Sequence, residues 1–184
     1  MRIRIVGMPV FNFIHEPLIK FKRAYPDYEL ALKEDSSSGI RQKILSGSLE
    51  CGFFLDSLKH QNISSSKIAR DKLGFAISKD NPLSKKTRLK LSHLKDQKVI
   101  LFPKNRNPQL YQNIFGGLEG VPDSNLLVAI MMATTDLGIA VIASNMRSLC
   151  PKSVKFIPHS GPSIGINIII GWLKGKTNPL EPFL

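Results

Sequence analysis

The segment Tyr28–Leu55, YELALKEDSSSGIRQKILSGSLECGFFL, decides the fold, because its pattern predicts a strand, a helix and a second strand in succession. Alternation in YELALKE is typical of a strand, and the apolar run LECGFFL is typical of a buried one. Between them, Ile40, Ile44 and Leu45 form the apolar stripe of a helix that stops at Gly47. This order of elements predicts parallel strands joined by a right-handed helical crossover.

The residues before this segment repeat the pattern. RIRIV at 2–6 alternates charged and apolar residues and reaches a turn at Gly7, which predicts a strand. The next predicted helix ends at Pro26 and carries four apolar residues on one face: Ile14, Leu18, Phe21 and Tyr25. We therefore expect an α/β fold with helices on the faces of a parallel sheet. Ligands of such sheets bind at the carboxyl ends of strands, here the loops that start at Gly7 and Ser36.

The second half of the chain contains further strands and helices without an internal repeat or a flexible tether. Apolar runs predict strands at 73–78, 98–103, 138–144, 153–158 and 164–173. Helices are expected at 108–115, at 125–134 and from Asn178 or Pro179 onward, and 81–97 forms a polar connector with a short helix. If two lobes exist, the chain therefore crosses between them without a flexible linker.

Three serines, Ser36, Ser37 and Ser38, stand at the expected start of the second helix. A helix leaves its first N–H groups unpaired, and a serine hydroxyl can cap one of them. The same end carries partial positive charge, so that spare hydroxyls and N–H groups there can hold a carboxylate. Capping alone is the simpler explanation for any one serine, and the residues by themselves leave both functions open.

The chain is strongly basic, with 26 Lys and Arg against 14 Asp and Glu and a net charge of +12. This balance suits nucleic acid, an anionic membrane or small anionic ligands. One acid, Asp96, opposes a run of cations that comprises Lys85, Lys86, Arg88, Lys90, Lys95, Lys98, Lys104 and Arg106. Only Phe102 provides an aromatic ring there, so the stacking surface of a single-strand binder is missing. We favour a solvated surface strip, with direct nucleic-acid binding as an alternative.

The sequence carries no recognisable catalytic or metal-binding pattern, so we expect neither an enzyme nor a bound metal or cofactor. Cys51 and Cys150 are far apart and form no CxxC motif, which indicates thiols in a reducing cytoplasm. No signal peptide precedes the first strand, and we expect a cytoplasmic protein. The apolar run 126–143 is interrupted by Thr134, Thr135 and Asp136, which favours a buried helix and strand over a membrane span.

Four stretches together resemble the effector-binding domain of LysR-type transcriptional regulators. They are Pro17–Phe54, Asp80–Tyr111, Leu137–Leu149 and Gly171–Leu184, and they occur in the order typical of that family. The resemblance implies the fold of type 2 periplasmic solute-binding proteins, with two Rossmann-like lobes joined by two crossover strands. We expect residues 1–74 and 151–184 to form lobe I, residues 75–150 to form lobe II, and an effector to bind in the cleft between them.

The resemblance also implies the residues that contact the effector. By position they are Met8 and Pro9 in the first strand-helix loop, Ser36, Ser37 and Ser38 at the start of the second helix, and Pro108, Gln109 and Leu110 after the fifth strand. Family members often carry a Ser or Thr at the position of Ser37 that binds an effector carboxylate. We therefore expect Ser37 both to cap the helix and to bind the effector.

The sequence departs from the family pattern at several positions. Met8 stands where family members often have a residue with a hydroxyl group, Asp136 where they usually have Gly, and Ala143 where they usually have Pro. The stretch from Tyr111 to Asn125 is several residues shorter than usual. These departures affect the expected class of effector more than the expected fold.

The resemblance implies a small-molecule sensor in which a small carboxylate shifts the arrangement of the lobes and alters the grip of an oligomer on DNA. A dimer or tetramer is expected, and DNA is expected to be contacted only through a winged helix-turn-helix domain absent from this chain. No membrane partner is expected. The alternative is a free-standing cytoplasmic solute-binding protein of the same fold without a role on DNA.

Overall fold

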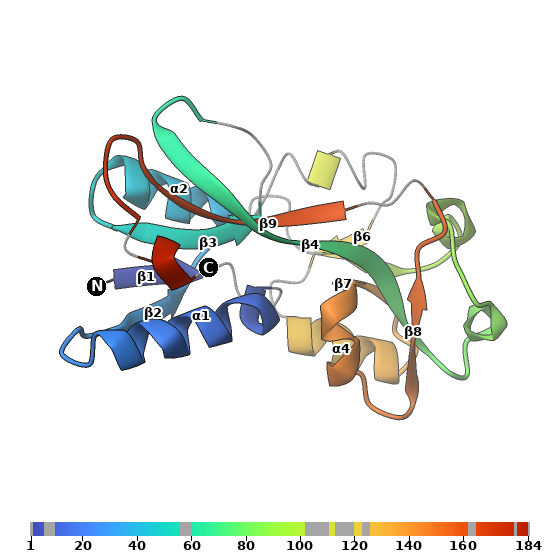
Figure 1. Ribbon diagram of the computed structural model, residues 1–184. Helices are drawn as coiled ribbons and strands as arrows, with labels where there is room; N and C mark the ends of the chain where they lie inside the picture. The colour runs from blue at the N-terminus through green and yellow to red at the C-terminus, as the bar shows by residue number, and fades with distance from the viewer. Residues whose placement is uncertain are drawn as a thin grey trace. The chain divides into compact units, whose positions relative to one another are not determined.

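A computed structural model of the chain shows two compact units (Figure 1). Unit 1 comprises Met1–Arg70 and Asn167–Leu184, and unit 2 comprises Asp71–Ile166. The structure describes residues 2–5, 10–55, 60–101, 111–112, 120–122, 126–161, 165–178 and 180–183.

The chain passes from unit 1 to unit 2 within strand β4 (Ile63–Ser78) and returns within strand β9 (Gly165–Leu173). These strands are the two expected crossovers. The divisions at 70/71 and 166/167 differ from the boundaries expected from the sequence, 74/75 and 150/151. The second difference arises because β8 (Val154–Pro158) pairs antiparallel with the unit 2 half of β4.

Unit 1 contains the parallel sheet that the sequence predicts. Strand β1 (Arg2–Ile5) lies between β2 (Ala31–Glu34) and β3 (Cys51–Leu55) and is parallel to both. Strand β9 pairs antiparallel on the other side of β3 and also neighbours β4. The carboxyl ends of β1, β2 and β3 therefore meet at one edge, where α2 begins directly after β2.

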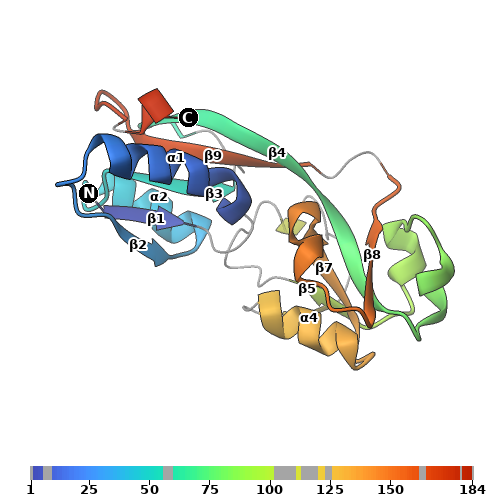
Figure 2. The ribbon, with the colours of Figure 1, turned by 60° about the horizontal axis from the view of Figure 1, so that its bottom comes forward.

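Helices α1 (Phe11–Ala24) and α2 (Ser37–Leu45) lie on opposite faces of this sheet (Figures 1 and 2). The apolar stripes predict their buried faces correctly for Ile14, Leu18 and Phe21 of α1 and for Ile40 and Ile44 of α2. Tyr25, which we expected on the same face, instead follows the end of α1 and is exposed.

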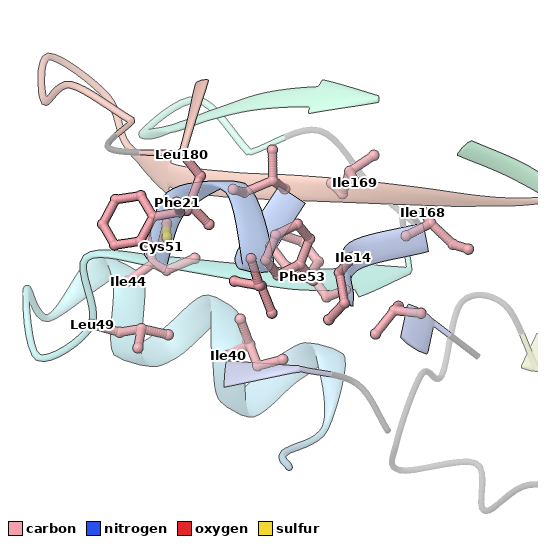
Figure 3. Close-up of a cluster of buried hydrophobic side chains, with 14 residues drawn as sticks. Ile14, Phe21, Ile40, Ile44, Leu49, Cys51, Phe53, Ile168, Ile169 and Leu180 are labelled. Atoms are coloured by element: carbon pink, nitrogen blue, oxygen red, sulfur yellow. The ribbon is translucent and has the colours of Figure 1, made fainter. Parts of the chain in front are cut away.

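The core of unit 1 draws side chains from both helices, β3 and β9 (Figure 3). Phe53 and Phe54 are adjacent in β3 and so point to opposite faces of the sheet, yet both are buried. Each buried Phe contributes roughly 1.5–3 kcal/mol. The burial of both shows that helices cover the two faces of the strand, as expected for a doubly covered α/β sheet.

Unit 2 contains a second sheet, in the order β4, β7 (Ile139–Ala143), β5 (Val99–Leu101) and β6 (Gly120–Pro122). Strands β5, β6 and β7 are parallel, whereas β4 is antiparallel to β7. Helix α4 (Leu126–Thr134) precedes β7, as predicted. The other described elements are short 3₁₀ turns: η2 (Pro82–Lys85), η3 (Leu91–Leu94), η5 (Ser144–Leu149) and, in unit 1, η6 (Glu181–Phe183).

Asp136, between α4 and β7, has a φ of 54°, in the left-handed region that favours glycine. Its side chain helps to hold this conformation, because Asp136 Oδ1 accepts a hydrogen bond of 3.3 Å from Asn81 Nδ2. Asp is one of the few residues besides Gly that adopt this conformation. The turn therefore has the left-handed backbone conformation typical of glycine, although the residue is Asp.

Candidate functional site

Ser36 is the cap of α2. Its backbone is extended, with φ −75° and ψ 155°, and its Oγ accepts a hydrogen bond of 3.0 Å from the N–H of Gly39. Its carbonyl oxygen accepts from the N–H of Ile40 at 2.9 Å. The prediction that a serine caps this helix is confirmed, but the prediction that Ser37 does so is wrong, since Ser37 is already the first helical residue.

Ser37 connects the start of α2 to the end of β3. Its side chain is buried, with only 1% of its surface exposed, and its Oγ accepts a hydrogen bond of 3.4 Å from the N–H of Leu55. A hydroxyl has one hydrogen to donate in addition to its two lone pairs. Ser37 can therefore donate to a second group at the carboxyl edge of the sheet while it holds β3.

Ser38 completes a group of three hydroxyls at this helix start. Its Oγ lies 3.1 Å from Ser36 Oγ, and both side chains are partly buried. The helix end adds N–H groups and partial positive charge to these hydroxyls. This end of α2 therefore presents several hydrogen-bond donors that suit a carboxylate.

Asp35, which the sequence analysis did not single out, lies beside the same helix end. Its Oδ1 accepts a hydrogen bond of 2.8 Å from the N–H of Ser36, and its Oδ2 forms an ion pair with Lys43. A side chain at Gly39 would overlap the Asp35 carboxylate, so the glycine gives it room. The negative charge is favourable at a helix start, and Lys43 offsets it for any further anion.

The structure brings together three of the expected effector-binding residues: Ser36, Ser37 and Ser38. The other five lie outside the described residues: Met8, Pro9, Pro108, Gln109 and Leu110. The ion pair has one signal in the sequence: an Asp directly precedes three serines, and a Lys follows eight residues after that Asp. This spacing puts Asp35 before the cap of α2 and Lys43 in its second turn.

Unit 2 holds an open pocket of about 390 Å³ lined by Ser144, Asn145, Arg147 and Ser148 of η5. Next to it, the buried Asp71 of β4 accepts hydrogen bonds from the Ser144 hydroxyl and from the N–H of Asn145 at 3.1 Å. The polar residues of this pocket form no recognisable motif, so the sequence does not predict it.

The two thiols are poorly suited to chemistry. Cys51 is buried in β3, and this burial, with a smaller effect of the Glu50 charge, raises its pKa to about 12. Burial also raises the pKa of Cys150 above its ordinary value. In the part of the chain that the structure describes, no three His, Cys, Asp or Glu residues gather to hold a metal. No helix among the described residues is long and apolar enough to cross a membrane.

A family model described as the LysR substrate binding domain matches residues 1–183. Two curated relatives are also similar. The HTH-type transcriptional regulator AlsR of Bacillus subtilis is 21% identical over 97% of this chain and 62% of its own length. The HTH-type transcriptional regulator BudR of Raoultella terrigena is 25% identical over 84% of this chain and 57% of its own length. The chain thus spans about three fifths of the length of these relatives.

Solved structures share the fold. The effector-binding domain of a BenM variant matches with a TM-score of 0.86 at 20% identity, over 99% of this chain and 89% of that chain. The BenM effector binding domain with its effector benzoate matches with a TM-score of 0.83 at 20% identity, over 98% and 86%. Full-length CbnR in complex with target DNA matches with a TM-score of 0.80 at 18% identity, over 100% and 67%. These matches confirm the expected two-lobe α/β fold.

Proposed function

Since the chain belongs to the LysR substrate-binding domain family, a family that is not enzymatic, we propose that it senses a small carboxylate for a LysR-type transcriptional regulator. The effector binds at the start of α2. The effector has a different affinity for each conformation of the regulator, so its binding favours one of them and changes how the regulator binds DNA.

The observation that supports this proposal is the group of serine hydroxyls at the N-terminal end of α2. Ser36 already caps the helix, which leaves Ser37 for a ligand, and the Ser37 hydroxyl retains a hydrogen to donate. The positive end of the helix adds to the attraction for an anion. Benzoate, named as the effector of BenM, is a carboxylate of the proposed kind.

The ion pair between Asp35 and Lys43 sets the charge of the proposed site. A bound carboxylate brings a second negative charge to a helix end that Asp35 already occupies. The ammonium group of Lys43 forms an ion pair with Asp35 and so offsets the negative charge of its carboxylate. The proposed effector therefore carries one carboxylate at this end, because Lys43 offsets only the charge of Asp35 and a second anionic group would be repelled by the first.

The remaining contacts in this proposal follow from the family resemblance. By their positions in the family pattern, the further proposed contact residues are Met8 and Pro9, and Pro108, Gln109 and Leu110. Met8 replaces a common hydroxyl residue, which favours an effector with an apolar body over a polyhydroxylated one. We expect aromatic and short aliphatic acids to bind better than sugar acids.

The relatives support a regulator over a free-standing solute-binding protein. AlsR and BudR, the two relatives named above, are HTH-type transcriptional regulators, and this chain spans about three fifths of each. DNA binding is therefore proposed for a whole protein that contains this chain. In such a regulator the domain self-associates, and the exposed apolar side chains of α4 are the proposed contact.

A thermal-shift screen of the purified chain tests the proposal. The probes are benzoate, short aliphatic acids and amino acids, with glucose and an uncharged benzamide as controls for the carboxylate. A ligand that binds only the folded state stabilises it by about 2.7 kcal/mol at a hundredfold excess over Kd. We expect a carboxylate to raise the melting temperature of the wild type and of Ser66→Ala, an exposed serine on β4.

The Ser37→Ala variant identifies the site. We expect it to fold and to bind the same acid at least tenfold more weakly, because it loses a hydrogen-bond donor to a charged group. Binding that is equal in Ser37→Ala and Ser66→Ala would contradict the assignment to α2. If no carboxylate stabilised the chain at all, the proposed class of effector would be wrong.

A further inference from the structure

Unit 2 exposes a dense group of cations that the proposed effector site does not use. We call it the basic strip, and its described members are Lys85, Lys86, Arg88, Lys90, Lys95 and Lys98, all of which are exposed. Within this segment only Asp96 carries a negative charge. The fourteen residues 85–98 therefore carry a net charge of +5, from six cations and one acid, out of the +12 of the whole chain.

These charges are not neutralised by neighbouring acids. Among the described residues, no acid forms an ion pair with a cation of the strip, and the ion pairs of Lys20 with Glu16 and of Lys43 with Asp35 lie in unit 1. A set of exposed, unpaired cations creates a positive potential that attracts polyanions and accelerates their association. Repulsion among the cations also raises the free energy of the folded protein, and a bound polyanion would relieve this repulsion.

The backbone beneath the strip is held firmly in place. Leu89 and Leu94 are fully buried between the exposed cations. The N–H of Leu89 donates to the carbonyl of Pro158 at 3.1 Å, and the N–H of Ser160 donates back to the carbonyl of Leu89 at 2.7 Å. The strip thus lies beside the end of β8 on a backbone that is fixed by burial and by main-chain hydrogen bonds.

Side chains reinforce both ends of the segment. Lys155 Nζ donates to the carbonyls of Ser84 at 2.6 Å and Lys86 at 3.4 Å, which adds another positive charge beside the strip. At the other end, Asn81 Nδ2 donates to Gln97 Oε1 at 3.3 Å. A surface with a fixed backbone loses less conformational entropy on binding than a flexible tail does.

From these observations we infer that the basic strip binds the phosphate backbone of duplex DNA without reading its sequence. Regularly spaced phosphates match a row of cations, and their release of counterions drives such binding. The segment between Lys79 and Lys98 contains no Phe, Tyr or Trp that could stack on bases, so phosphate contacts remain. This contact goes beyond the proposed sensing of an effector, and it would add to a DNA-binding domain outside this chain.

An acidic protein is the competing partner. Protein interfaces depend on a central apolar or aromatic anchor surrounded by polar residues. The strip has no exposed anchor of this kind, because its leucines are buried or partly buried beneath the cations. A row of like charges without an exposed apolar anchor favours nucleic acid over an acidic protein as the partner of the strip.

Fluorescence anisotropy of the 184-residue chain with a labelled 20-base-pair duplex of mixed sequence tests the inference, with NaCl varied between 50 and 200 mM. The strip variant is Lys85→Glu/Lys86→Glu/Arg88→Glu. The matched control is Lys67→Glu/Lys174→Glu/Lys176→Glu, which changes the net charge equally at exposed positions of unit 1. A milder variant, Lys90→Gln/Lys95→Gln/Lys98→Gln, covers the case in which charge reversal prevents folding, and circular dichroism checks each protein.

We expect the strip variant to bind the duplex at least tenfold more weakly than wild type and the control less than threefold more weakly. The plot of log affinity against log salt should become shallower by up to about three for the strip variant, as expected for three lost phosphate contacts. Equal weakening in both variants, no binding at 50 mM NaCl, or equally tight binding of poly-glutamate would overturn the inference. The effector screen is independent of this experiment, because none of the three variants changes a residue of α2.

Discussion

The buried carboxylate of Asp71 shows how one residue can hold two segments together in unit 2. Asp71 lies on β4, and its oxygens accept hydrogen bonds from the Ser144 hydroxyl, from the N–H of Asn145 and, at 2.7 Å, from the N–H of Lys72. The bonds from Ser144 and Asn145 link β4 to the start of η5, more than seventy residues later in the chain. Removal of the carboxylate would leave partly buried donors without this acceptor, which costs about 1–3 kcal/mol.

We therefore predict that Asp71→Ala lowers the free energy of unfolding by about 1–3 kcal/mol. Urea denaturation followed by circular dichroism measures this loss. Ser144→Ala is the matched control, and we expect a smaller loss because the N–H of Asn145 keeps its acceptor. An Asp71→Ala protein as stable as wild type would show that these hydrogen bonds contribute nothing.

Single residues also mark the limit of prediction from the sequence. Three serines at a helix start predict a cap, but Ser36 and Ser37 are equivalent in pattern until the backbone shows which residue is extended. The hydrogen bond between Ser37 and Leu55 joins the start of α2 to the carboxyl end of β3, and no local pattern in the sequence encodes it. Asp136, by contrast, was identified as standing in a glycine position, and its φ of 54° agrees.

Helix α2 is defined at both ends by local chemistry. Ser36 caps the first turn, and Gly47, with a φ of 73°, follows the last turn in the left-handed conformation that glycine adopts without strain. Between these ends, Ile40 and Ile44 bury the inner face. The sequence predicted these features because each depends on residues within one or two turns.

We predict that Ser36→Ala destabilises the chain by about 1 kcal/mol, because the N–H of Gly39 loses its acceptor. Ser36→Asp should retain most of the stability, since a carboxylate also caps a helix and suits its positive end. Thermal unfolding of both variants and of Ser66→Ala measures the difference. A loss in Ser36→Asp as large as in Ser36→Ala would argue against capping.

Elements without an apolar signal were harder to predict. Strand β4 was predicted only at 73–78, but it begins at Ile63. Its first half, residues 63–70, is polar, with four residues exposed and none fully buried, and it lies beside β9 in the sheet. Such a segment has no apolar periodicity from which a strand could be predicted. The expected final helix is instead the short turn η6, which is too brief for a helical stripe.

At the scale of the whole molecule, both units expose apolar side chains on a helix. The exposed apolar side chains of α4 are Leu127, Val128 and Met131, and 66% of the surface of Met131 is exposed. On α1, Ile19 is exposed among basic residues. Exposed apolar faces of this kind indicate contact with another protein. Together with the family resemblance, they support the proposed self-association of a basic domain.

We predict that the chain self-associates more strongly as salt rises, because salt screens the repulsion between its positive surfaces. Sedimentation velocity at 50 and 500 mM NaCl measures the shift, and Met131→Lys should keep the chain monomeric. Leu32→Lys, at an exposed apolar position on β2, is the matched control. Association that Met131→Lys leaves unchanged would exclude this face of α4.

The binding of a carboxylate at the start of α2 is tested most directly by a titration of the ¹⁵N-labelled chain with the best acid of the thermal-shift screen. Backbone amide shifts in a ¹H–¹⁵N spectrum report which N–H groups meet the ligand. The proposed site predicts the largest changes at Ser38, Gly39 and Leu55, and their loss in Ser37→Ala. Changes confined to Ser144–Ser148, with none near α2, would contradict it and assign the ligand to the pocket of unit 2.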